Sequence, residues 1–374
     1  MNSGSDTAPG PGQALPDRVG GLLRRGTRNA HLWLPGYVAA RLRPRPRPWR
    51  AWFTIADHFE PGWNHADPST ARERVARWRV AWPEIAARHR DSDGRPPQYT
   101  FFYPQEEYAA ERLQPLAELR DLGIADVDVH IHHDGEGERN FVDRMATFIE
   151  VLRARHGLLR QRDGQTVFGF IHGNWALDNA RPDGRWCGLN NELTLLRNLG
   201  CYADFSLPAV PDPSQAGLVN TIYWATDDPE RPRSHATGVP VVPGRPSMGD
   251  LLMIPGPLGL DWTDRRPWKP RIDTGELAAN ASAGRHRVAL WLKVAPRLGN
   301  DVFVKLFAHG AQERHSAPLL GGDLDRLFTH IRETCVGEGI EFRYVTAWEM
   351  RQAVDRVASA GVPPGGRIES VLPR

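Results

Sequence analysis

The chain has 374 residues, of which 40% are hydrophobic and 25% are charged, and its formal net charge is +2. This composition is typical of a globular protein and excludes fibrous and wholly disordered chains. The small net charge gives no electrostatic reason to expect nucleic acid as a partner. No apolar run approaches the roughly 18 residues of a transmembrane helix, and no signal pattern opens the chain, so we expect a cytoplasmic protein.

Residues 1–48 are predicted to form a disordered, basic and proline-rich tail before a domain at 49–374. Residues 1–16 are rich in Gly, Pro and Ser, and a short amphipathic helix is expected within 17–48. A linker follows, in which prolines alternate with arginines. We expect a solvated connector, with peripheral contact to an anionic membrane surface as the alternative. The arginines concerned are Arg41, Arg43, Arg45, Arg47 and Arg50.

From Trp49 onward, short apolar runs alternate with helical patterns. Strands are predicted at Ala51–Ala56, Gln98–Tyr103, Asp126–His132, Thr166–His172, Cys201–Leu207, Leu218–Ala225, Val302–His309 and Ile340–Thr346. Helices are predicted at Thr70–His89, Glu106–Leu122, Glu138–His156, Asn190–Leu199, Arg285–Arg297, Asp323–Val336 and Trp348–Ala358. This alternation predicts an α/β fold with a mainly parallel sheet, and seven or eight units favour a distorted (β/α)7–8 barrel. The stretch 208–284 breaks the rhythm and is predicted to be an insertion beside the active site.

The helix at Thr70–His89 carries apolar residues at helical spacing, Trp78 and Trp82 among them. Such a stripe is typical of a buried helix face, so we expect these tryptophans in the core. Ser69 and Thr70 are expected to cap its start.

Polar clusters follow the carboxyl ends of several predicted strands. In a parallel β/α barrel these ends open onto one face, which carries the active site. The clusters are Asp57-His58-Phe59-Glu60, His130-Ile131-His132-His133-Asp134, His172-Gly173-Asn174-Trp175 and Ala308-His309-Gly310.

The segment 126–132 alternates strictly between apolar and polar residues. We expect Val127, Val129 and Ile131 to face the helices, and His130 and His132 to face the interior. Two imidazoles close together are typical of a site for Zn²⁺ or a similar divalent ion. Asp57 and His133 are further candidate ligands.

Two other observations bear on the site chemistry. His309 ends a strand, and Gly310 lets the chain turn beyond it, which suits a general acid or an oxyanion-stabilising imidazolium at the rim. Cys187, Cys201 and Cys335 show no paired spacing, which argues against a disulfide framework and against a cysteine-based zinc site.

At these residues the chain resembles the polysaccharide deacetylases of the NodB-homology type, carbohydrate esterase family 4. The resemblance covers roughly residues 50–350 and depends on short motifs, with a helix-then-strand unit at 192–208 as further support. The motifs are Thr54-Ile55-Ala56-Asp57, His130 to Asp134, and Leu306-Phe307-Ala308-His309.

The resemblance implies that Asp57 and His130 bind the metal and that His309 protonates the leaving group. The chain departs from the family pattern at two positions, which marks it as a divergent branch. Ala56 stands where the family has its general base. His58 or Glu60 is therefore expected to handle the proton, or Asp57 is the catalytic base and the metal is held differently. The second metal histidine is expected where Asp134 stands, so His132 or His133 takes its place.

The predicted function is metal-dependent removal of N-acetyl or O-acetyl groups from a sugar or polysaccharide. Asp134, His172, Asn174 and Trp175 are the expected substrate-binding residues, because aromatic rings such as Trp175 stack on sugars. Two alternatives remain open. One is an amidohydrolase-type enzyme, suggested by the His-x-His pair, and the other is a catalytically degenerate glycan-binding homologue, suggested by Ala56.

Overall fold

The structure is a computed structural model that describes residues 29–263 and 270–360. Its strands are β1 (Arg50–His58), β2 (Tyr99–Pro104), β3 (Ala125–Ile131), β4 (Arg160–Arg162), β5 (Gln165–His172), β6 (Cys201–Asp204), β7 (Tyr223–Ala225), β8 (Val239–Pro240), β9 (Leu251–Met253), β10 (Gly259–Asp261), β11 (Arg271–Asp273), β12 (Glu276–Leu277), β13 (Arg297–Leu298), β14 (Asp301–Ala308) and β15 (Glu341–Tyr344). Its α-helices are α2 (Ala30–Leu42), α3 (Pro68–Arg88), α4 (Ala110–Asp121), α5 (Glu138–His156), α6 (Glu192–Leu199), α7 (Arg285–Val294), α8 (Glu313–Pro318), α9 (Leu324–Glu338) and α10 (Ala347–Ser359). A strand occurs within each of the predicted strand segments, and each predicted helix is present.

Within the described residues, thirteen strands form one sheet with the order β12-β14-β1-β2-β3-β5-β6-β9-β7-β8 and with β4, β13 and β15 on side branches. The pairs from β12 to β9 along this path are parallel, whereas β7 pairs antiparallel with β9 and β8. The predicted α/β class with a mostly parallel sheet is therefore confirmed. No ladder among the described residues joins the two ends of the path, β12 and β8.

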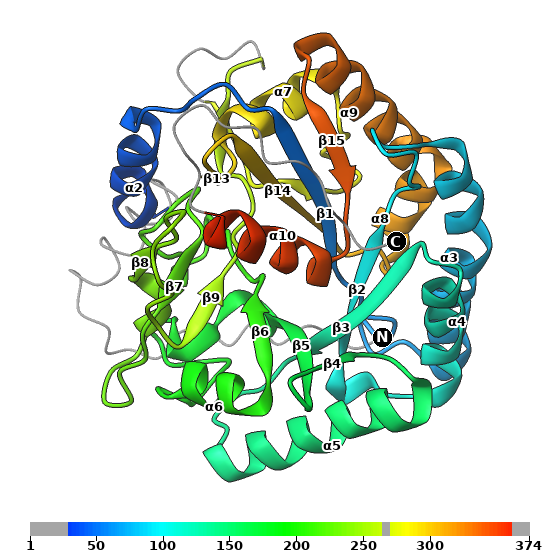
Figure 1. Ribbon diagram of the computed structural model, residues 1–374. Coiled ribbons are helices and arrows are strands. Elements are labelled where there is room, and N and C mark those ends of the chain that lie inside the picture. Colours follow the sequence, from blue (N-terminus) through cyan, green and yellow to red (C-terminus); the bar gives the residue numbers. More distant parts are fainter. Residues whose placement is uncertain (1–28, 264–269, 361–374) are drawn as a thin grey trace, which may run out of the picture.

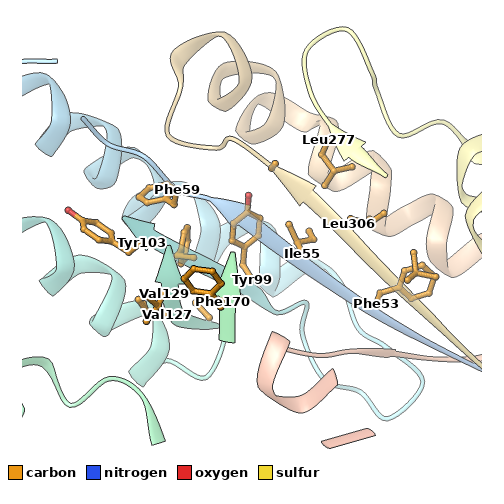
Figure 2. Close-up of a cluster of buried hydrophobic side chains, with 14 of the residues drawn as sticks. Phe53, Ile55, Phe59, Tyr99, Tyr103, Val127, Val129, Phe170, Leu277 and Leu306 are labelled. Atoms are coloured by element: carbon orange, nitrogen blue, oxygen red, sulfur yellow. The ribbon is translucent and has the colours of Figure 1, made fainter. Parts of the chain in front are cut away.

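The sheet has a buried apolar layer on each face. Phe53 and Ile55 of β1 pack in one buried layer (Figure 2). The same layer holds Trp78 and Trp82 of α3. Trp52, on the opposite face, packs in a second layer with residues of α10. In Figure 1, α3, α4, α5 and α9 lie along the outside of the strands. Helix α10 lies in the centre of this view, with the strands around it. Because both faces are covered, the strands are buried nearly throughout.

Helix α3 confirms the predicted core position of its tryptophans. Trp78 and Trp82 are fully buried, and their indole N–H groups donate to the carbonyl oxygens of Gly310 (2.7 Å) and Ile124 (3.0 Å). The cap prediction is wrong by two or three residues. The N-cap is Asp67, whose carboxylate accepts from the backbone N–H groups of residues 69 and 70. A carboxylate there satisfies free backbone donors and favours the positive end of the helix dipole.

Residues 29–48, which the sequence assigns to a disordered tail, instead pack on the main body. Residues 1–28 of the predicted tail lie outside the described part. Trp33 of α2 is 4% exposed and packs with Val210, Val219 and Leu258 of the predicted insertion. Arginines of the linker also form hydrogen bonds with the main body. The guanidinium of Arg45, for example, donates to the carbonyl oxygen of Lys293 at 2.7 Å. In the described ranges, no helix has the length and apolar character to cross a bilayer.

The stretch 208–284 holds β7 to β12, all of two or three residues. β9 pairs with β6, so part of this stretch extends the main sheet, while β10 and β11 form a separate ladder. Arg287 of α7 holds the stretch in place through its buried ion pair with Asp273, with Nε–Oδ2 at 2.5 Å and Nη2–Oδ1 at 3.0 Å.

Candidate metal centre

Three parallel strands bring polar side chains to one edge of the sheet. His58 is the last residue of β1, His130 lies at the end of β3, and His309 follows β14. The parallel pairing of β1 with β14, of β1 with β2 and of β2 with β3 brings these carboxyl ends to the same edge. Glu60, two residues beyond β1, lies between them and is 7% exposed. The predicted convergence of strand ends is therefore observed for these four residues.

Glu60 is the point at which two imidazoles meet. Its Oε1 lies 3.4 Å from Nε2 of His130 and 3.4 Å from Nε2 of His132. The other ring nitrogen of each histidine is already engaged: Nδ1 of His130 lies 2.8 Å from the carbonyl oxygen of Ile171, and Nδ1 of His132 lies 2.5 Å from Oε1 of Glu106. These partners fix the ring orientations and leave both Nε2 atoms facing Glu60.

The protonation states follow from burial and these partners. Burial alone would raise the pKa of Glu60, but the adjacent imidazoles of His130 and His132 outweigh it and hold that pKa well below its usual value. Burial likewise opposes charge on His132, yet Glu106 and Glu60 raise its pKa to about 10. Nε2 of His130 is buried and lacks a partner with hydrogen-bond geometry. A buried unpaired acceptor beside a carboxylate favours a cation between them.

His58 and His309 form a second pair of imidazoles beside Glu60. Their ring centroids are 4.8 Å apart, and the ring of His58 lies 5.2 Å from that of His130. Nε2 of His58 is buried without a partner. Burial is the main cause that lowers the pKa of His58 well below its usual value and that of His309 to about 4. His309 is half-buried, so its ring reaches the rim.

Asp57 does not join this group, contrary to the ligand role that the family resemblance implies. Its carboxylate accepts from the Tyr99 hydroxyl (2.7 Å) and the Gly310 N–H (2.8 Å), on the helix-facing side of β1. Strand alternation is the reason, since His58 occupies the interior face. Burial raises the pKa of Asp57 to about 7. Asp57 therefore anchors the turn after His309, where a Cβ on Gly310 would collide with this carboxylate.

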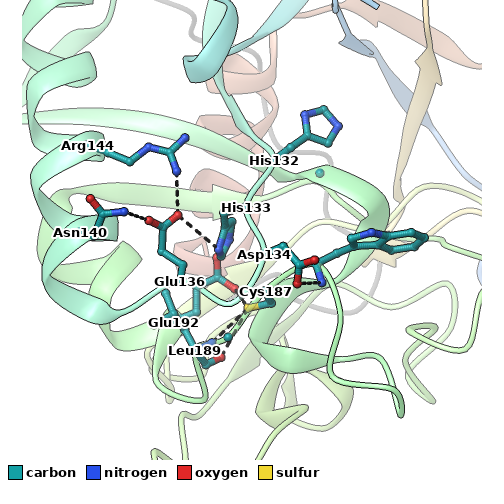
Figure 3. Close-up of polar contacts among 12 residues, drawn as sticks. His132, His133, Asp134, Glu136, Asn140, Arg144, Cys187, Leu189 and Glu192 are labelled. Carbon is teal, nitrogen blue, oxygen red and sulfur yellow. Dashed lines mark hydrogen bonds and ion pairs between the residues drawn. The ribbon is translucent and has the colours of Figure 1, made fainter. Parts of the chain in front are cut away.

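His133 and His172 also lie apart from the Glu60 group, and this corrects two predicted roles. Figure 3 shows His132 and His133 pointing in different directions. His133 turns inward to Glu192, with Nε2 3.1 Å from Oε1, so it is not a partner of His130. His172 is fully buried beside it and is out of reach of a substrate. Asp134 is exposed, and its carboxylate accepts from the backbone N–H of Trp186 at 2.7 Å.

The remaining predicted substrate residues lie in the turn after β5. Asn174 and Trp175 both have positive φ angles of 55°, and Trp175 is half-buried. Its ring lies 6.2 Å from that of His58 and 6.5 Å from that of His309. Trp175 and Phe307 also line a cavity of about 560 Å³ with Pro208, Ala209 and Glu276. The cavity therefore adjoins the His58–His309 pair.

Sequence reasoning missed two carboxylates that the structure assigns to this region. Glu106 follows β2 in a short 3-10 turn (Gln105–Glu107), so the same strand-end position that drew attention to His58 was available for it. Glu192, by contrast, begins α6 and is joined to His133 only through the fold. Its pattern in the sequence is that of an ordinary first-turn helix residue.

The donor set of the centre is two imidazoles and one carboxylate, within reach of two further imidazoles. Side chains within reach of a common ion include Glu60, His130 and His132, and also His58, Glu60 and His309. Nitrogen and oxygen donors of this kind suit a divalent transition metal, zinc included. Comparisons with protein-family models and with curated proteins give no match to the chain.

Proposed function

We propose that the chain is a divalent-metal-dependent hydrolase that removes an acetyl group from a sugar, as a divergent carbohydrate deacetylase. In this proposal the mostly parallel sheet corresponds to the distorted β/α barrel of that family. The metal is held by His130, His132 and Glu60, and the His58–His309 pair carries the proton. Zinc is the proposed ion because two imidazoles and a carboxylate match its catalytic sites.

One observation carries the proposal. The Nε2 atoms of His130 and His132 lie 3.4 Å from the same Glu60 oxygen, while their Nδ1 atoms are fixed by Ile171 and Glu106. Oriented imidazoles with outward partners are characteristic of metal ligands. Among the described contacts, the imidazoles of His58 and His309 have no such partners. We therefore assign acid–base catalysis, rather than metal binding, to His58 and His309.

The chemistry divides between the ion and the chain. A bound divalent ion would polarise the acetyl carbonyl and acidify a water molecule. The His58–His309 pair accepts the proton of that water and returns it to the departing amine or hydroxyl, so the pair ends unchanged. His309 at the rim is the member placed to return it. Asp57 contributes by holding the turn after His309 in position.

The adjoining cavity is the proposed binding site for the sugar. At about 560 Å³ it lies within the usual range for small-molecule sites. Trp175 and Phe307 offer aromatic faces, on which sugar rings stack, and Glu276 offers a carboxylate for sugar hydroxyls. An acetyl group that extends from such a sugar past Trp175 would reach the His58–His309 pair.

The test combines metal content with turnover on a panel of acetylated sugars and chitooligosaccharides. We expect His132→Ala to lose about one metal ion per chain together with activity, and His309→Ala to keep its full metal content while kcat falls by roughly two to four orders of magnitude. His31→Ala is the matched control, because this histidine is exposed on α2. A metal content equal to that of the wild type in both His130→Ala and His132→Ala would refute the site.

The same panel separates the two alternative functions. Binding of glycans without turnover, in protein that carries metal, would identify a degenerate glycan-binding protein. Turnover of small cyclic amides in place of acetylated sugars would identify an amidohydrolase-type enzyme. Either result would replace the deacetylase assignment.

A further inference from the structure

A second group of metal-binding side chains lies behind the candidate centre. It consists of His133 after β3, His172 at the end of β5, Cys187 in the loop that follows, and Glu192 at the start of α6. The His133, His172 and Glu192 side chains are 0% exposed, as is Cys187. The four donor atoms lie within 4.8 Å of one another. This group shares no residue with the Glu60 group.

The separations resemble those inside a tetrahedral metal site. Nε2 of His133 and Nε2 of His172 lie 3.1 Å and 3.5 Å from Oε1 of Glu192, and Sγ of Cys187 lies 3.3 Å from its Oε2. With metal–nitrogen and metal–sulfur bonds of about 2.0 and 2.3 Å, neighbouring donors in a tetrahedral zinc site lie roughly 3.3–3.7 Å apart. Only small movements are needed to enclose an ion.

Unpaired buried atoms point to such an ion. Nδ1 of His172 lies 2.5 Å from the carbonyl oxygen of Gly173, so it carries the hydrogen and Nε2 presents a lone pair. This Nε2 is buried without a partner, although it faces the carboxylate of Glu192. Two acceptors facing each other in a closed interior repel, and a cation between them removes the repulsion.

Surrounding contacts hold the donors as they do in metal sites. The backbone N–H of Asp178 donates to Oε2 of Glu192 (2.7 Å), and the backbone N–H of Leu189 donates to Sγ of Cys187 (3.4 Å). The backbone donors to Glu192 and Cys187 fix the orientation of these two side chains. Glu136 lies 3.9 Å from Nδ1 of His133, beyond hydrogen-bond distance, and is itself paired with Arg144 at 2.7 Å (Figure 3).

We propose that His133, His172, Cys187 and Glu192 form a closed structural site for a zinc-class divalent ion. Four protein donors leave no open position for a substrate, which is the pattern of structural sites. The ion would tie the ends of β3 and β5 to the loop before α6. Burial raises the pKa of the Cys187 thiol, and a bound divalent ion reverses this by favouring the thiolate. The proposal does not depend on the hydrolase function.

Cobalt substitution tests the site, because only a cysteine ligand gives a thiolate-to-cobalt charge-transfer band in the near ultraviolet. Full-length protein loaded with Co²⁺ should show this band, and Cys187→Ser should lose it together with about one metal ion per chain. Cys201→Ser is the matched control, since Cys201 is also a buried free thiol. His132→Ala should keep the band, because that change affects only the Glu60 group.

Bound cobalt without the band in the wild type, or a band that persists in Cys187→Ser, would overturn the proposal. Where Cys187→Ser does not fold, X-ray absorption of the zinc-loaded wild type decides, and it should show a sulfur neighbour at about 2.3 Å. Absence of that neighbour overturns the site. Failure of the Glu60 site is distinguishable, since it would leave one cobalt ion and an intact band.

Discussion

Lys305 provides a quantitative test of the interior electrostatics. It lies on β14 and is 1% exposed, and its Nζ donates to the carbonyl oxygen of Phe205 at 2.7 Å. Burial lowers its pKa from 10.5 to about 7, with the nearby Asp204 opposing the shift. We expect Lys305→Met to change the pH dependence of the free energy of unfolding.

The magnitude follows from the difference between the folded and unfolded pKa values. The interval from about 7 to 10.5 corresponds to about 5 kcal/mol of cost to the folded state when the lysine is charged. Between these values the unfolded chain binds a proton that the folded chain does not, so wild-type stability rises with pH. From about pH 7.5 to 9.5 the wild type should gain about 2.5 kcal/mol relative to the variant.

The assay is urea unfolding followed by tryptophan fluorescence at several pH values in this window. Lys293→Met serves as the control, because Lys293 is exposed on α7 and should leave the pH dependence unchanged. Parallel pH profiles for wild type and Lys305→Met would refute the reasoning, since they would show that this lysine titrates alike in the folded and unfolded chains.

Three further changes test other parts of the structure, each by urea unfolding. Arg287→Met leaves Asp273 buried without its ion partner and should cost about 3–5 kcal/mol, with a smaller cost when Asp273→Leu is added. Thr346→Ala removes the capping box of α10 and should cost about 1 kcal/mol. Gly310→Ala pushes a methyl group against Asp57 and should lower turnover as well as stability; an unchanged variant would contradict the close packing there.

The sequence predicted those features that depend on local periodicity. Alternation in 126–132 correctly placed Val127 and Val129 in the helix-facing layer and turned His130 inward. The same rule applied to β1 separates Asp57 from His58, and the structure follows it where the family resemblance does not. Physical alternation was the better guide at that position.

Other features were beyond sequence reasoning because they depend on turns and distant contacts. His133 follows the end of β3, where period-two alternation stops, so its direction could not be derived. Cys187 is a lone cysteine with no paired spacing, and only the fold brings it to His172. The positions of β9 and β12 likewise depend on their pairing with the distant strands β6 and β14 rather than on strong local sequence patterns.

The pairing of β1 sets a condition on biosynthesis. One edge of β1 pairs with β14 along nearly its whole length, and the other edge pairs first with β15 and then with β2. Trp52 therefore stays next to an open ladder until β14 and β15 have been synthesised. Long-range closure of this kind slows folding and exposes an apolar edge to other chains. A chain that stops before β14 should consequently aggregate rather than fold as a smaller domain.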